Sequence, residues 1–171
     1  MTKEDEKRIK AWIESLVRGR VGTMTDEETI ARIHLPYPVK GVGKHRVVYD
    51  LGKGKILKVA KVKKGIRCNR NEVSLYKEVS SRLRRHLCEV LDHGKGWVVM
   101  KKMNAKLPSE PKYAEQLDEI RDNFLKAGVQ ITDLYRRKSG KPKRENLRLD
   151  KKKDIVVIID YANQIPLSES S

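Results

Sequence analysis

Lys58 interrupts a run of apolar residues, Ile56-Leu-Lys-Val-Ala60, of the kind that forms a β-strand. Because strand side chains alternate between faces, Lys58 shares a face with Ile56 and Ala60. A buried ammonium group needs an anion beside it. Two environments therefore fit: an exposed position on an edge strand, or a buried position where the ammonium group binds an anion such as phosphate.

Glu72 follows Lys58 by 14 residues and is a candidate partner for it. The segment Asn69-Arg-Asn-Glu72 begins a predicted helix, and a helix packed on the sheet could direct this carboxylate at Lys58. The ion pair would hold the ammonium group ready for phosphate oxygens. Glu78, six residues further on, competes for this role but lies on a different face of the helix.

Asn146 and Asp160 lie at the two ends of a predicted hairpin near the C-terminus. Asn146 opens one strand, and Asp160 ends the apolar run 155–159. Amide and carboxylate oxygens at the mouth of a hairpin suit Mg²⁺, which shares its oxygen ligands with phosphates; alternatively, Asp160 caps the next turn. Asp133 is placed to orient an attacking hydroxyl group or to accept its proton.

Gly41 and Gly43 precede the first predicted strand. Glycine leaves room for a ligand to approach the backbone, so these residues are candidates for nucleotide binding. The alternative is an ordinary turn.

The elements around these residues predict an α+β fold. Pro36 and Pro38 mark a boundary near residue 40, and the segment 136–144, with six basic residues, reads as a solvated loop. Helices are predicted at 3–20, at a short segment that starts at Thr25, at 69–85 and at 112–126. Strands are predicted at 46–51, 55–60, 90–91, 97–100, 147–149 and 155–159.

Composition limits the class of protein. The 171 residues carry a net charge of +16, of which residues 41–171 contribute +15, a field that attracts anions without selecting one. Cys68 and Cys88 form no metal-binding motif, so free thiols are expected. No apolar stretch approaches the roughly 20 residues of a membrane span, and we expect a cytoplasmic protein that does not insert into a membrane.

The order of these motifs resembles the protein-kinase-like superfamily, most closely its small atypical and aminoglycoside-phosphotransferase-like branches. Lys55-Ile-Leu-Lys-Val-Ala60 resembles the strand of the phosphate-binding lysine, with Glu72 as its partner. Ile131-Thr-Asp133-Leu resembles the segment of the catalytic aspartate. Trp97–Met103 resembles the strand that leads to the hinge, so Met100 and Lys102 would meet adenine. Asn146-Leu-Arg-Leu resembles the segment of the metal-binding asparagine, and Ile158-Ile-Asp160-Tyr-Ala resembles the segment of the metal-binding aspartate.

The resemblance implies an ATP- and Mg²⁺-dependent phosphotransferase with an unknown acceptor. It divides the chain into an N-terminal helical extension (1–40), an N-terminal lobe of antiparallel sheet and one helix (41–103), and a reduced helical C-terminal lobe with a β-hairpin (104–171). Asp133 and Asn146 are 13 residues apart, where the family has about five, and Ala162 replaces a glycine. Only 11 residues follow Asp160, so a protein partner could complete this lobe.

Two other functions fit the sequence. Basic clusters at 61–64, 82–85 and 136–144 could bind nucleic acid in a salt-dependent way. Alternatively, the chain could be an inactive pseudokinase that serves as an interaction module, with the apolar stripe around Trp12 docking on a partner.

Overall fold

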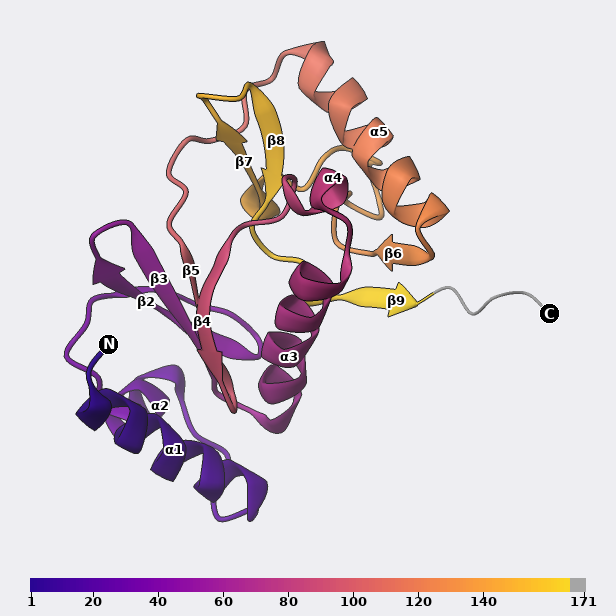
Figure 1. Cartoon of the computed structure of the whole chain (residues 1–171). Coiled ribbons are helices and arrows are strands. Elements are labelled where there is room, and N and C mark those ends of the chain that lie inside the picture. The colour runs from indigo at the N-terminus through magenta and orange to yellow at the C-terminus, as the bar shows by residue number, and fades with distance from the viewer. Residues whose placement is uncertain (167–171) are drawn as a thin grey trace. The chain divides into compact units, whose positions relative to one another are not determined.

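The computed structural model describes residues 1–166, which form two compact units. The first unit comprises Met1–Val73 and Val90–Lys102, and the second comprises Ser74–Glu89 and the chain from Met103 onward. Helix α3 (Lys63–Glu78) begins in the first unit and ends in the second (Figure 1).

The first unit contains a five-stranded antiparallel sheet with the order β1-β2-β3-β5-β4. Its strands are β1 (Val39–Val42), β2 (Arg46–Gly52), β3 (Lys55–Ala60), β4 (Val90–Gly94) and β5 (Trp97–Lys101). Strand β3 is central, and Lys58 lies opposite Val48 on β2 and Val98 on β5. An exposed edge position for Lys58 is therefore excluded.

A tight turn joins β2 to β3. Gly52 and Gly54 adopt positive φ angles of 71° and 72°, a conformation that glycine reaches without the steric cost of a side chain. The backbone N–H of Lys102 donates a hydrogen bond to the carbonyl of Gly54 over 2.8 Å, so the end of β5 lies beside this turn.

Two helices cover part of this sheet. Helix α1 (Lys3–Val17) and helix α2 (Asp26–Ile33) each begin with a capping box, the second of which involves Thr25 and Glu28. The indole of Trp12 donates a 2.7 Å hydrogen bond to the carbonyl of Ala60. The core that they share with the sheet includes Ile9, Trp12, Ile13, Leu16, Ile33, Val47, Tyr49, Leu57 and Val59.

This packing corrects one sequence-based alternative. Trp12 is 3% exposed, and its apolar stripe is covered by the sheet of its own unit. The stripe therefore serves as core, because hydrophobic burial against β2 and β3 is available within the chain. It does not form a docking surface for a partner.

The second unit combines helix α5 with short antiparallel strand pairs. Its elements are α4 (Ser81–Arg84), α5 (Pro111–Lys126), a 3₁₀ turn (Arg144–Asn146), and strands β6 (Val129–Ile131), β7 (Leu147–Asp150), β8 (Ile155–Ile158) and β9 (Gln164–Pro166). Strand β7 pairs with β8, and β6 pairs with β9. Leu117, Ile120 and Phe124 of α5 are buried, as are all four residues of β8.

Some element bounds differ from the sequence-based expectation. Helix α3 starts at Lys63 and ends at Glu78, and a separate short helix then begins after Ser80, where the sequence predicts one helix over 69–85. Asn146 ends a 3₁₀ turn instead of opening a strand, and β8 ends at Ile158, two residues before Asp160. Among residues 1–166, no helix is long and apolar enough to span a membrane.

Candidate functional site

Lys58 and Glu72 form a buried ion pair in the first unit. The ammonium nitrogen Nζ of Lys58 lies 2.8 Å from Oε1 of Glu72. Lys58 is 4% exposed and Glu72 is fully buried, so neither charge is screened by bulk water. Glu78, the competing candidate, lies exposed in the last turn of α3.

Two further residues hold the carboxylate of Glu72 in place. Nη1 of Arg46 lies 2.5 Å from Oε2 of Glu72 and donates to Oδ1 of Asn69 over 3.1 Å. Asn69 in turn donates through Nδ2 to the carbonyls of Gly96, at 2.8 Å, and Lys58, at 3.3 Å. This hydrogen-bonded network fixes the position of Glu72, because each buried polar side chain in it has a partner.

Sequence reasoning missed Arg46 and Asn69. Arg46 stands at the first position of a strand, where an arginine is ordinarily exposed. Asn69 lies three residues before Glu72 and so shares its helix face, and this spacing is the only signal that could have pointed to it.

The glycine pair lies in the hairpin between β1 and β2. Gly41 is opposite Val48, and the N–H of Gly43 donates to the carbonyl of Arg46 over 2.9 Å. A Cβ atom at Gly41 would meet no atom within 4 Å, so the fold itself does not require glycine there. Burial, together with the charges of Lys64, Lys44 and Arg46, lowers the pKa of the nearby His45 imidazole.

The end of β5 contains the two predicted adenine contacts. Met100 is fully buried between Ile56 and Val90 of the neighbouring strands. Lys102 uses its N–H in the bond to Gly54, and its Nζ lies 2.7 Å from Oδ2 of Asp50. The hydrogen bond from Lys102 lowers the pKa of the Asp50 carboxyl group. An adenine contact through the N–H of Lys102 would have to displace Gly54.

In the second unit, Asn146 lies against Asp133 despite their separation in sequence. Its amide nitrogen Nδ2 donates to the backbone carbonyl of Asp133 over 3.0 Å. The intervening basic loop is closed at its base, because the N–H of Lys143 donates to the carbonyl of Leu134 over 2.8 Å. The 13-residue spacing therefore reflects a loop that returns to its starting point, and the two predicted site residues meet.

The carboxylate of Asp133 is accessible and has two neighbours. Its Oδ1 lies 3.2 Å from Nζ of Lys143, and its Oδ2 accepts a 2.8 Å hydrogen bond from Nδ2 of Asn163. The side chain is 37% exposed, in contrast to that of Glu72. Asn163 was not identified from the sequence. The N–H of Thr132 donates to the Asn163 carbonyl over 3.1 Å, and nothing in the sequence pattern shows that the segment after Asp160 runs beside Thr132.

Asp160 lies in a segment that is fixed on both sides. The N–H of Ile159 donates to the carbonyl of Asn146 over 2.8 Å, and the hydroxyl of Tyr161 donates to the carbonyl of Cys88 over 2.7 Å. The predicted pair Asn146 and Asp160 is thus adjacent at the end of the β7–β8 hairpin, as expected from the sequence.

The donor set at this hairpin fits a magnesium ion. Because Nδ2 of Asn146 binds a carbonyl, its Oδ1 is the atom left to face a cation, and Asp160 supplies a carboxylate. Mg²⁺ in phosphate chemistry is held by one or two protein oxygen ligands and keeps waters and phosphate oxygens as the others. Within residues 1–166, no group of three or more His, Cys, Asp and Glu side chains forms a more complete metal site.

Comparisons with known proteins identify the fold. No protein-family model and no curated protein matches the sequence. The bifunctional kinase-methyltransferase WbdD is similar in structure, with a TM-score of 0.55 and 17% identity over 74% of this chain and 31% of that one. The Legionella pneumophila kinase Lpg2603 bound to IP6 gives a TM-score of 0.56 and 18% identity over 81% of this chain and 52% of that one.

The chain has a kinase-like fold. It spans about a third of the length of WbdD and about half of that of Lpg2603. The predicted α+β architecture, with an antiparallel sheet and a reduced helical part, is confirmed. Identities of 17% and 18% support the fold alone and assign the chain to no family.

Proposed function

We propose that this chain is a phosphotransferase that uses ATP and Mg²⁺. The observation that carries the proposal is the buried ion pair between Lys58 and Glu72, within a kinase-like fold. An ammonium group fixed on a central strand by a carboxylate from the following helix is suited to bind nucleotide phosphates. A salt bridge buried for stability alone is a weak alternative, since hydrophobic residues of similar volume would often serve as well.

In the first unit, Lys58 would contact the α- and β-phosphates, and Glu72 would keep its ammonium group in position. Arg46 and Asn69 act on Glu72 and are positioning residues. The backbone at Gly41 and Gly43 would approach the phosphates, and the backbone from Met100 to Lys102 would meet adenine through groups other than the Lys102 N–H, which binds Gly54.

In the second unit, Asn146 and Asp160 would hold Mg²⁺, which when bound neutralises charge on the transferred phosphoryl group. Asp133 would orient the acceptor hydroxyl and accept its proton. Asn163 and Lys143 would hold the Asp133 carboxylate in its orientation. Catalysis would then consist of positioning and charge stabilisation.

Thermal denaturation with and without Mg·ATP tests nucleotide binding. At 100 times the dissociation constant, binding adds about 2.7 kcal/mol, which raises the melting temperature by roughly 2–4 °C per kcal/mol in a protein of this size. We expect Lys58→Ala and Asp160→Ala to abolish the increase. Lys55→Ala, at the exposed start of the same strand, is the matched control and should keep it. A folded native chain without any Mg·ATP effect would refute the proposal.

Turnover is tested with Asp133→Asn. If Asp133 is the base, the substitution lowers the rate of ATP hydrolysis or autophosphorylation by about 10²–10⁴-fold and leaves the Mg·ATP shift in melting temperature intact. Equal turnover by the native chain and the variant would remove Asp133 from the mechanism. Binding without turnover in both proteins would identify a pseudokinase.

Nucleic-acid binding remains a prediction of the sequence. Several cations of the basic clusters are engaged within the chain: Lys61 pairs with Asp26, Arg136 pairs with Glu145, and Arg84 donates to backbone carbonyls. These contacts favour structural roles for part of the charge. Retention on a DNA column that falls steeply with added salt would support this alternative.

A further inference from the structure

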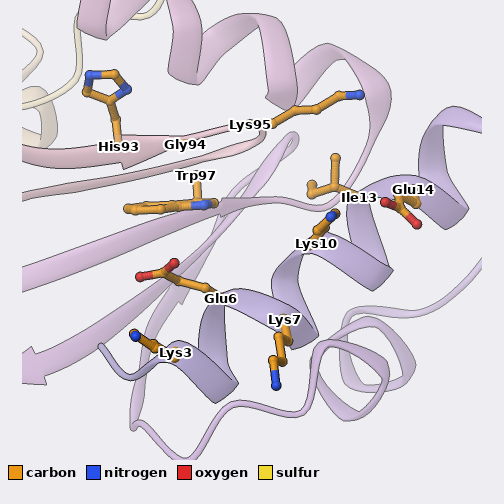
Figure 2. A pocket seen from close by; sticks show the side chains of 10 residues that line it. All are labelled: Lys3, Glu6, Lys7, Lys10, Ile13, Glu14, His93, Gly94, Lys95 and Trp97. Carbon is orange, nitrogen blue, oxygen red and sulfur yellow. The ribbon is translucent and has the colours of Figure 1, made fainter.

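A pocket of about 690 Å³ lies within the first unit, between helix α1 and the turn that joins β4 to β5 (Figure 2). This volume falls within the range of small-molecule sites, about 300–1,000 Å³. None of the residues proposed for nucleotide binding lines it. The pocket therefore shares no lining residue with the proposed phosphotransferase site.

Four lysines border the pocket. Lys3, Lys7 and Lys10 follow one another on α1 at spacings of four and three residues, which places them on one face, and Lys95 comes from the β4–β5 turn (Figure 2). In the part of the chain that the structure describes, no ion pair within 4.0 Å engages any of these four ammonium groups.

The charge balance of the pocket favours an anion. Glu6 and Glu14 are the two acids that line it, so its formal charge is +2 with histidine neutral. The N-terminal segment 1–40 has almost no net charge, so this concentration of lysines is a local feature of the helix face.

The apolar wall of the pocket is rigid. The Trp97 ring lies so close to Gly94 that an added Cβ atom there would be 2.5 Å from its indole nitrogen. Ile13 packs equally closely on Gly96, where a Cβ atom would meet its Cδ1 at 2.4 Å. Helix α1 is therefore held against the turn, and Trp97 and Ile13, which are 9% and 1% exposed, are buried in this contact (Figure 2).

We propose that this pocket binds a small molecule with at least two phosphate groups. The lysines supply point charges that suit phosphates at variable distances. A single phosphate would engage only part of this charge. The ligand class follows from the lining alone and does not depend on the activity of the second unit.

Isothermal titration with inorganic tripolyphosphate tests the charge requirement. The double variant Lys7→Ala/Lys10→Ala should weaken binding at least tenfold, whereas Lys151→Ala/Lys152→Ala, which removes the same charge from the exposed β7–β8 turn, should leave it within twofold. Both substitutions are at exposed positions, so the melting temperatures should match that of the native chain. Lys58→Ala should retain the binding.

Three results would overturn the proposal. Equal losses of affinity in the two double variants would show that tripolyphosphate binding depends only on the net charge of the chain. Loss of all binding in a Lys58→Ala variant that keeps the circular-dichroism spectrum of the native chain would place the phosphate at the nucleotide site. Failure of the native chain to bind tripolyphosphate, while it binds a poly-glutamate peptide, would assign the surface to an acidic macromolecule.

Discussion

The two sets of candidate site residues are held in opposite ways. In the first unit, Glu72 is completely buried and binds Lys58 and Arg46 through its side chain. In the second unit, Asp133 is 37% exposed, and its contact with Asn146 runs through a backbone carbonyl. One set is a closed ionic network, and the other presents its carboxylate to solvent.

This difference suits the chemistry that each set would perform. A cation that must meet phosphates in one geometry benefits from a fixed partner, and burial removes the competition of water. A carboxylate that accepts a proton or exchanges metal ligands must stay accessible. We therefore expect substitutions in the first set to lower stability strongly, and substitutions in the second set to affect mainly binding and turnover.

Glu72→Ala should have the largest effect. Removal of one partner from a buried ion pair costs about 3–5 kcal/mol, because the remaining charge stays buried without compensation. Glu78→Ala, in the same helix but exposed, should change the free energy of unfolding by less than about 0.5 kcal/mol. Urea denaturation of both variants measures the contrast. Similar values for the two would mean that the Lys58–Glu72 pair does not contribute to the stability of this unit.

Asn146→Ala should have an intermediate effect. It removes the donor to the Asp133 carbonyl from a position that is 8% exposed, and we expect a loss of about 1–2 kcal/mol. Asn163→Ala, on the exposed side of Asp133, should cost less. If Asn146 binds Mg²⁺, its loss should also raise the magnesium concentration needed for the Mg·ATP shift, which a magnesium titration would detect. An unchanged requirement for magnesium would limit Asn146 to a structural role.

The sequence was sufficient to predict the residues that break a pattern. Lys58 was identifiable because it interrupts an apolar run, and Asp160 because it follows one. Glu72 followed from its distance along the chain to Lys58 and was preferred correctly over Glu78 as the ion-pair partner. The kinase-like α+β fold followed from the order of these motifs, which the comparisons confirm.

Other features could not be predicted because tertiary contacts create them. Arg46 and Asn163 are ordinary polar residues at the ends of elements, and only the folded chain brings them to Glu72 and Asp133. The start of α3 shows no apolar periodicity in the sequence, because the helix begins with Lys63-Lys-Gly65. Strands β1, β6 and β9 have three or four residues each, which is too short for an alternating pattern to be detected.

Gly41→Ala should have the smallest effect on stability and provides the most specific test of the first unit. Gly41 does not adopt a positive φ, and the added methyl group meets no atom within 4 Å. The substitution should therefore leave the free energy of unfolding unchanged or raise it by up to about 1 kcal/mol, because alanine reduces the entropy of the unfolded chain. Gly52→Ala, at a φ of 71°, should instead be destabilising.

If the backbone of the β1–β2 hairpin approaches nucleotide phosphates, the methyl group of Gly41→Ala occupies space that the ligand needs. The Mg·ATP shift in melting temperature should then decrease in a protein that is at least as stable as the native chain. This combination would separate a loss of ligand space from a loss of fold, which Glu72→Ala cannot do. An undiminished shift would restrict the phosphate contacts of the first unit to Lys58 and would leave the hairpin as an ordinary turn.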